Sequence, residues 1–167
     1  MSERIRVFII DDSAYMRKMI GQMLTHHPSI MVVGSARNGL DGLEQVQELR
    51  PDVITVDMQM PEMDGVDFVR LQMKKRRIPI VVVSSVADQA LEAVQLGALE
   101  FVQKPTGLAN ARVLEMQEQL IAKVLAAGRS FPDNLGLHPS GELQLQVQRS
   151  LSGVDAVVLG LSTGGPQ

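Results

Sequence analysis

Five short apolar runs alternate with five segments of helical periodicity between residues 5 and 125, and this alternation limits the possible folds more than any other feature. The apolar runs are short and rich in β-branched residues, which predicts buried strands. They are Ile5–Ile10, Ile30–Ala36, Val53–Val56, Pro79–Val83 and Leu99–Val102. Strands that alternate with helices form parallel βαβ units with helices on both faces of the sheet. The sequence therefore predicts an α/β fold with a doubly wound, five-stranded parallel sheet.

The segments between the strands carry apolar residues three or four positions apart, which predicts amphipathic helices. The first helix ends near His26, and the fourth, from Val86 to Leu96, has the weakest pattern. The last helix is expected from Asn110 to Leu125. After about Ala127 the sequence becomes rich in Gly, Pro and Ser, so we place the end of the first domain there.

Composition excludes several functional classes. The 167 residues carry a formal net charge of -3, so there is no basic footprint for nucleic acid. The chain contains no cysteine, which rules out disulfides and thiolate metal sites. The N-terminal segment has neither the pattern of a signal peptide nor the length of a membrane span. We therefore expect a cytoplasmic protein without membrane insertion.

Polar side chains follow four of the predicted strands. Asp11 and Asp12 follow the first strand, Asp57 the third, Ser84 the fourth and Lys104 the fifth. Because the carboxyl ends of parallel strands meet at one edge of the sheet, these residues should converge on one crevice.

These residue types together suit phosphoryl transfer. Three carboxylates repel one another unless a cation lies among them, and a set of oxygen ligands favours a hard ion such as Mg²⁺. A carboxylate nucleophile, a metal, an ammonium group and a hydroxyl donor are the groups that such chemistry requires. For Asp11 or Asp12 taken singly, a helix-capping or solvated role is the alternative.

The motifs at these positions are Asp11-Asp12, Asp57-Met58-Gln59-Met60-Pro61-Glu62-Met63-Asp64-Gly65, Val83-Ser84-Ser85 and Lys104-Pro105. With them, residues 4 to about 125 resemble a response-regulator receiver domain. The resemblance implies a flavodoxin-like fold in which Asp57 receives a phosphoryl group from the phosphohistidine of a sensor histidine kinase. It also implies Mg²⁺ held by Asp12, Asp57 and the backbone carbonyl of Gln59, with Asp11 contributing through water.

The same resemblance assigns roles to three further residues. Lys104 would pair with the phosphoryl oxygens, and the Ser84 hydroxyl would bond to them. Phe101 would turn inward after phosphorylation and change the surface around it; without the resemblance, it could equally be a core residue. The Lys104-Pro105 peptide bond is expected to be cis.

The tail predicts a second domain. Residues 128–153 read as an interdomain linker, and Val154 to Leu161 as a new buried strand that lacks its partners and should be disordered or pair with another chain. Gly160-Leu161-Ser162-Thr163-Gly164 matches the G-x-S-x-G pattern of a serine nucleophile between a strand and a helix. A phosphate-cradling loop or an ordinary turn is the alternative for this pattern.

A receiver followed by a linker and this serine motif resembles the chemotaxis protein-glutamate methylesterase family. The resemblance implies that Ser162 attacks methylated glutamates of chemoreceptors and can also deamidate glutamines, and that the unphosphorylated receiver covers the catalytic domain within the same protein. The family's serine works with a later His and Asp. His26, His27 and His138 do not match those positions, so we expect the 167 residues, a truncated form that stops at residue 167 of the starting catalytic domain (154–167), to have no esterase activity.

Three other functions were weighed. The first is a receiver that acts only through protein binding, but the motif at Gly160–Gly165 has no role in such a protein. A receiver that feeds a DNA-binding module would need a basic helix-turn-helix pattern after Gly128, and none is present. An aspartyl-phosphate hydrolase usually carries a second Asp two residues after the nucleophile, where this chain has Gln59.

Overall fold

The computed structural model describes residues 4–85, 87–105 and 110–130, and its elements alternate as the sequence predicts. The strands are β1 (Ile5–Ile10), β2 (Ile30–Ala36), β3 (Val53–Val56), β4 (Ile80–Ser84) and β5 (Glu100–Gln103). The helices are α1 (Ala14–Thr25), α2 (Gly39–Leu49), α3 (Gly65–Lys75), α4 (Ala87–Gln95) and α5 (Asn110–Ser130). Each bound lies within a few residues of the prediction, except at the end of α5.

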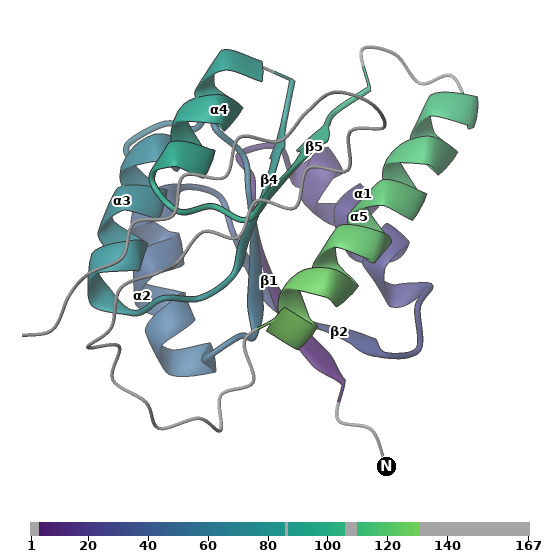
Figure 1. Cartoon of the computed structure of the whole chain (residues 1–167), viewed down its shortest axis with the longest axis horizontal. Helices are drawn as coiled ribbons and strands as arrows, with labels where there is room; N and C mark the ends of the chain where they lie inside the picture. Colours follow the sequence, from purple (N-terminus) through teal and green to yellow (C-terminus); the bar gives the residue numbers. More distant parts are fainter. Residues whose placement is uncertain (1–3, 86, 106–109, 131–167) are drawn as a thin grey trace, which may run out of the picture. The chain divides into compact units, whose positions relative to one another are not determined.

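The strands form one parallel sheet in the order β2-β1-β3-β4-β5 (Figure 1). The chain moves from β1 outward to β2, then returns to the other side of β1 and continues outward through β5. β1 and β3 therefore lie side by side where the direction of winding reverses, which is where ligands bind in open parallel sheets. The predicted doubly wound, flavodoxin-like fold is confirmed.

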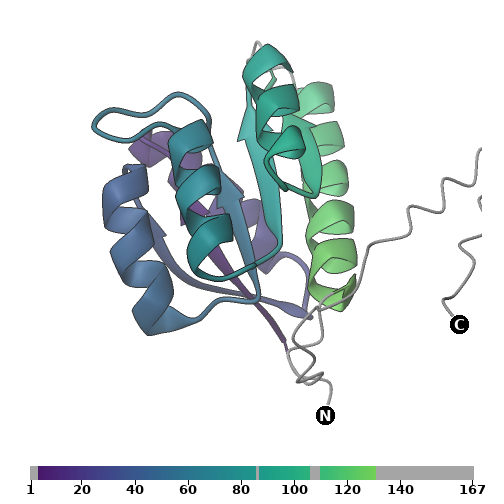
Figure 2. The ribbon, with the colours of Figure 1, turned by 60° about the vertical axis from the view of Figure 1, so that its left-hand side comes forward.

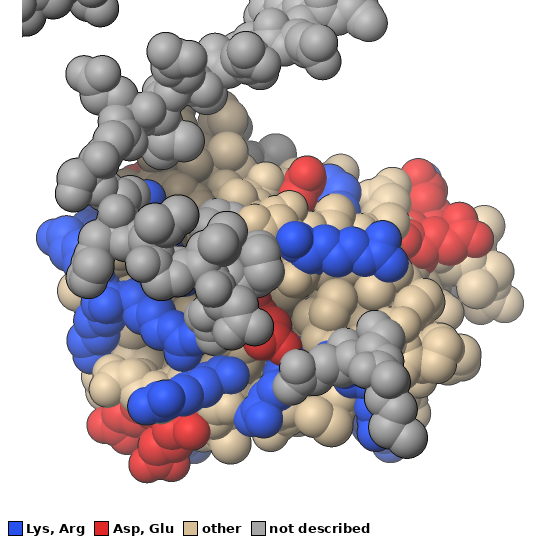
Figure 3. All heavy atoms as spheres, turned by 60° about the horizontal axis from the view of Figure 1, so that its bottom comes forward, with Lys and Arg blue, Asp and Glu red and all other residues tan. Residues whose placement is uncertain are grey.

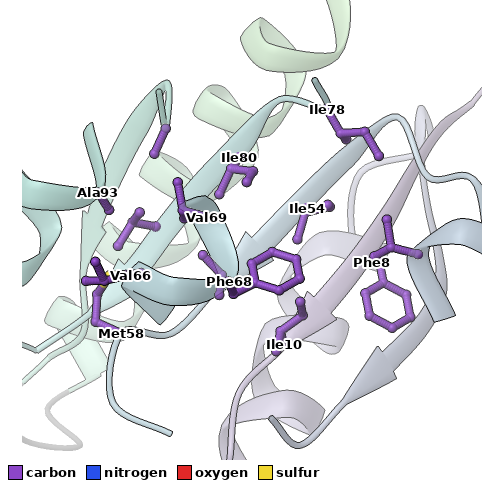
Figure 4. Packing of buried hydrophobic residues seen from close by; sticks show 14 of the residues in the cluster. Phe8, Ile10, Ile54, Met58, Val66, Phe68, Val69, Ile78, Ile80 and Ala93 are labelled. Atoms are coloured by element: carbon purple, nitrogen blue, oxygen red, sulfur yellow. The ribbon is translucent and has the colours of Figure 1, made fainter. Parts of the chain in front are cut away.

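The helices cover both faces of the sheet, with α1 and α5 on one and α2, α3 and α4 on the other (Figure 2). Alternate residues of β1 divide between the two cores: Phe8 and Ile10 face the α2–α4 side, whereas Val7 and Ile9 face the α1–α5 side. On the first face the ring of Phe68, which α3 carries, lies beside Ile10 and Ile54 (Figure 4). Both faces of the central strand are thus dry, which explains its continuous apolar sequence.

Helix α5 continues to Ser130, past the Leu125 and Ala127 where the sequence predicts its end. Gly128, assigned to the linker because glycine weakens helices, lies inside the helix. A Cβ atom at this position would come within 2.7 Å of Ile5 Cδ1, so the missing side chain lets Ile5 pack against the helix. Ala127 is buried beside it. Tertiary packing therefore outweighs the low helix propensity of glycine.

The end of the domain at which the strands begin and the helices finish is rich in basic side chains. Helix α3 has Lys74 and Lys75 in its last turn, where cations are favourable near the negative end of the helix dipole. Figure 3 turns the bottom of Figure 1 forward and shows Lys and Arg side chains grouped on the left of that view. The acidic residues at the carboxyl ends of the strands lie at the opposite end of the sheet.

Two further observations concern the whole chain. By contacts it divides into two compact units, Met1–Leu135 and Gly136–Gln167, and the second lies outside the described residues. The predicted linker 128–153 beyond Ser130, the strand at Val154 to Leu161 and Ser162 are therefore not described. None of the helices within the described ranges is long and apolar enough to span a bilayer.

Candidate functional site

Asp11 and Asp57 are adjacent because of the register between β1 and β3. Ile10 pairs with Val56, so the next residue of each strand emerges at the same edge of the sheet. Backbone hydrogen bonds hold both positions: the Asp57 N–H donates to the Ile10 carbonyl over 2.9 Å, and the Asp11 N–H to the Ala36 carbonyl over 3.1 Å. Both side chains are buried. The predicted meeting of the two carboxylates is therefore a direct result of strand pairing.

Lys104 joins these two carboxylates from the end of β5. Its Nζ lies 2.6 Å from Asp57 Oδ2 and 2.8 Å from Asp11 Oδ2. The Lys104 N–H donates to the Ser84 carbonyl over 2.9 Å, which ties the lysine backbone to the end of β4. The expectation of a cis bond before Pro105 is wrong, because all peptide bonds in the described residues are trans. The trans form is the intrinsically preferred one, and Lys104 reaches the crevice with it.

Asp12 completes a cluster that suits a divalent cation. One oxygen from each of Asp11, Asp12 and Asp57 can be chosen so that all lie within 4.8 Å of one another, and Asp12 is exposed to solvent. Three carboxylates and the single ammonium of Lys104 leave an excess of two negative charges. Hard oxygen donors with this excess fit Mg²⁺, which prefers carboxylates and retained water. The donor chemistry of the cluster therefore agrees with the metal that the sequence implies.

The electrostatics of the crevice oppose the ionised form of Asp11. Burial raises the pKa of its carboxyl above 3.8; the hydrogen bond and charge of Lys104 act in the other direction, and the charge of Asp57 adds to the increase. Burial alone would lower the pKa of Lys104, but its bonds to Asp11 and Asp57 outweigh this and raise it above 10.5. The lysine therefore stays charged at neutral pH, and the carboxylates of the cluster remain short of positive charge.

The loop after β3 holds Asp57 closely. Its Oδ1 accepts the Met58 N–H over 2.7 Å. The Gly65 N–H donates to the Met58 carbonyl over 3.0 Å, and a Cβ atom on Gly65 would collide with the Asp57 carbonyl oxygen. Glycine at position 65 thus lets the start of α3 approach the phosphoacceptor candidate. The motif contained this glycine, but its steric role becomes visible only in the structure.

The sequence analysis missed a contact that anchors the far end of this loop. Buried Asn38 caps α2 by accepting the Asp41 N–H over 2.8 Å, and its amide donates to Glu62 Oε2 over 3.2 Å. Glu62 has a φ of 65°, a left-handed conformation that is uncommon outside glycine. The Asn38-Gly39 pair indicated only a turn, and nothing in the sequence pointed to a partner 24 residues away.

The remaining site residues occupy different places. Ser84 is buried at the end of β4, beside the strand that leads to Asp57. Gln59 is exposed in the loop after Asp57. Phe101 is half-buried on β5 and packs against the edge of the α2–α4 core, while its carbonyl accepts Lys123 Nζ over 2.6 Å. Their parts in phosphorylation stay predictions.

Removal of the charge of Asp11 should stabilise the metal-free protein. Since burial raises the pKa of this carboxyl, folding favours its neutral form. We expect Asp11→Asn to increase the free energy of unfolding at pH 7 by about 1 kcal/mol, an ordinary size for a point substitution. Urea denaturation in the presence of a chelator measures it.

The pH dependence of this gain has a definite sign. The neutral carboxyl stabilises the parent fully below the unfolded-state pKa near 3.8, and this contribution is lost as the pH rises through the raised folded-state pKa. The difference between Asp11→Asn and the parent should therefore be small at low pH and grow across that window. A variant that is less stable than the parent at pH 7 would contradict the expectation.

Comparison with known proteins gives consistent matches for this arrangement. The family model for the response regulator receiver domain matches residues 7–116. A crystal structure of the response regulator domain of Thermotoga maritima CheB is similar with a TM-score of 0.71 and 36% sequence identity, covering 78% of this chain and 100% of that one. The receiver domain of NarL from Mycobacterium tuberculosis has a TM-score of 0.66 and 25% identity, over 77% and 99% of the two chains.

Curated relatives extend the similarity along the whole chain. A protein-glutamate methylesterase/protein-glutamine glutaminase of Halalkalibacterium halodurans is 40% identical over 176 residues, which cover 100% of this chain and 49% of the relative. The protein of the same name from Pyrococcus horikoshii is 35% identical over 175 residues, covering 100% and 48%. The chain therefore spans about half the length of the curated relatives that it matches.

Proposed function

Because the chain belongs to the response regulator receiver domain family, we propose that Asp57 is its phosphoacceptor and that the crevice around it carries out phosphoryl transfer. The observation that supports this most strongly is the contact of Lys104 with both Asp57 and Asp11 beside a third carboxylate, Asp12. A receiver is the input module of a two-component system, so the phosphoryl donor would be the phosphohistidine of a sensor histidine kinase.

In the proposed reaction, an oxygen of the Asp57 carboxylate forms a bond to phosphorus while the bond from phosphorus to the histidine nitrogen breaks. The leaving nitrogen takes the electron pair of that bond. Lys104 is near enough to Asp57 to exchange its carboxylate partner for the oxygens of the arriving phosphoryl group. The Ser84 hydroxyl, from the end of the neighbouring strand, would donate to another phosphoryl oxygen.

We propose that Mg²⁺ is held by Asp12, Asp57 and the Gln59 carbonyl, with Asp11 contributing through water. When bound, the ion would neutralise the excess negative charge of the cluster and of the phosphoryl oxygens. The residues of the chain supply the geometry: strand register fixes Asp57 and Asp11, and the Met58 N–H orients the Asp57 carboxylate. The phosphoryl group would then add about one to two negative charges to a buried position.

The test is phosphoryl incorporation from acetyl phosphate, followed by intact-protein mass spectrometry with Mg²⁺ and with a chelator. One group per chain is expected with Mg²⁺, and the product should be cleaved by hydroxylamine because it is an acyl phosphate. Equal incorporation with the chelator would contradict the metal assignment. A product that resists hydroxylamine would contradict an acyl phosphate on Asp57.

We further propose that this receiver (residues 1–127) controls a methylesterase half that begins near residue 154, with 128–153 as linker. The support is the similarity to proteins named protein-glutamate methylesterase/protein-glutamine glutaminase along the full chain. Ser162 would be the nucleophile toward methylated chemoreceptors, and the receiver would contact the catalytic half in the same protein, with Phe101 taking part in its release.

This second proposal is tested on a coding sequence extended to its natural stop codon. Methanol release from methylated receptor should be strong in the extended protein and lost in Ser162→Ala. Ser152→Ala, in the proposed linker, is a matched control that should keep the activity. Undiminished release from Ser162→Ala would exclude Ser162 as the nucleophile.

A further inference from the structure

Arg17 makes two contacts with the acidic loop that its position in the sequence did not suggest. Its Nη1 donates to the backbone carbonyl of Asp11 over 2.8 Å and to that of Asp12 over 3.1 Å. Its own N–H donates to the Ser13 carbonyl over 2.9 Å as part of the first turn of α1. One side chain thus holds two successive peptide groups between β1 and α1.

The position of Arg17 is unfavourable for the helix taken alone. The first turn of a helix favours anions, because the N-terminal end of the helix dipole is positive, and α1 has no acidic residue in that turn. A guanidinium group placed there needs a compensating role. The two carbonyl contacts provide it, and both are made to the residues whose carboxylates form the acidic cluster.

We infer that Arg17 is a positioning residue for the divalent-cation site, acting through the peptide groups of Asp11 and Asp12. This inference rests on the proposed function, since it requires the metal at this cluster. The carboxylate of Asp11 is also restrained by the Ser13 N–H, which donates to its Oδ1 over 2.9 Å. Asp12 is exposed, so the direction of its side chain depends on the backbone that Arg17 holds.

Two effects of Arg17 on metal binding have opposite signs. Its positive charge near the cluster repels a divalent cation, whereas its hold on the loop keeps the ligands in place before the cation arrives. Lys18 allows the two effects to be separated, because it is an exposed cation on the same helix. Lys18→Met removes one charge and leaves the contacts of Arg17 intact.

The experiment is calorimetric titration of the whole 167-residue chain with Mg²⁺, for the parent, Arg17→Met, Arg17→Lys and Lys18→Met. We expect the Kd of Arg17→Met for Mg²⁺ to be about tenfold higher than that of Lys18→Met, as is usual when a residue that orients metal ligands is lost. Arg17→Lys keeps the charge and can replace one of the two bonds, so its Kd should lie between those of the parent and Arg17→Met. With acetyl phosphate, the labelling rate of Arg17→Met should recover when Mg²⁺ is raised to saturation.

A Kd for Arg17→Met equal to or below that of Lys18→Met would overturn the inference. A loss of unfolding free energy in metal-free Arg17→Met with an unchanged Kd would also overturn it, since that result describes a purely structural residue. The titration uses no phosphodonor, so it is independent of the labelling test. Failure of the parent to bind Mg²⁺ would overturn the proposed metal site itself, whereas a parent that binds with an unaffected Arg17→Met refutes only the role of Arg17.

Discussion

Asp57→Asn protein should carry no phosphoryl group after incubation with acetyl phosphate and Mg²⁺, under conditions in which the parent is fully labelled. The amide of asparagine is too weak a nucleophile to replace the carboxylate. It has nearly the same shape and can still accept the Met58 N–H and a bond from Lys104, so the fold should be kept. Intact-protein mass spectrometry measures the labelling, and a denaturation curve verifies folding.

Asp64→Asn is a matched control for this substitution. Asp64 caps α3 by accepting the Asp67 N–H over 2.9 Å, and asparagine is an equally good cap. The exposed Asp64 side chain points away from the described ion pairs of Lys104, so this variant should label like the parent. If Asp57→Asn incorporated a phosphoryl group as the parent does, another residue would be the acceptor and the assignment of Asp57 would be wrong.

Lys104→Met should destabilise the metal-free protein by about 3 kcal/mol, the usual scale for the removal of one member of a buried ion pair. Lys104 is the cation that contacts the buried carboxylates of Asp11 and Asp57. Without it, two carboxylates remain in a site that already opposes the ionised form of Asp11. Urea denaturation at neutral pH, with a chelator present, measures the loss.

Mg²⁺ should restore more stability to Lys104→Met than to the parent. The variant has a larger excess of negative charge at the cluster, so it should bind the ion more tightly, and an ion that binds only the folded state stabilises it. Lys123→Met is the control, since its ion pair with Glu100 is more exposed and should be worth less than about 1 kcal/mol. A loss in Lys104→Met no larger than in this control would show that Lys104 is dispensable for the apo fold.

The sheet was predictable because its strands are buried on both faces. Phe8 and Val7 face different helices, yet both are apolar, so the run is unmistakable without any tertiary information. The meeting of Asp11, Asp57 and Lys104 was also predictable, because parallel strands bring their carboxyl ends to one edge whatever their order. The order of the strands, which makes Asp11 and Asp57 direct neighbours, came only from the structure.

What the sequence did not predict depends on contacts between distant loops. The bond from Asn38 to Glu62 joins two turns, and neither residue type is unusual in its own turn. Arg17 gave one usable signal, a cation where a helix favours an anion, but its partners are backbone carbonyls and leave no pattern in the sequence. The end of α5 was missed for a similar reason, since Gly128 is helical because Ile5 packs against it.

The contact between Gly128 and Ile5 also determines where the polypeptide leaves this domain. It ties the last turns of α5 to the first residue of β1, at the edge of the sheet opposite Asp57. Helix α5 has 21 residues and is about 30 Å long, several times the distance over which salt screens a charge. A phosphoryl group on Asp57 therefore has little direct electrostatic effect on the segment after Ser130, and any message to that segment must travel through rearranged packing.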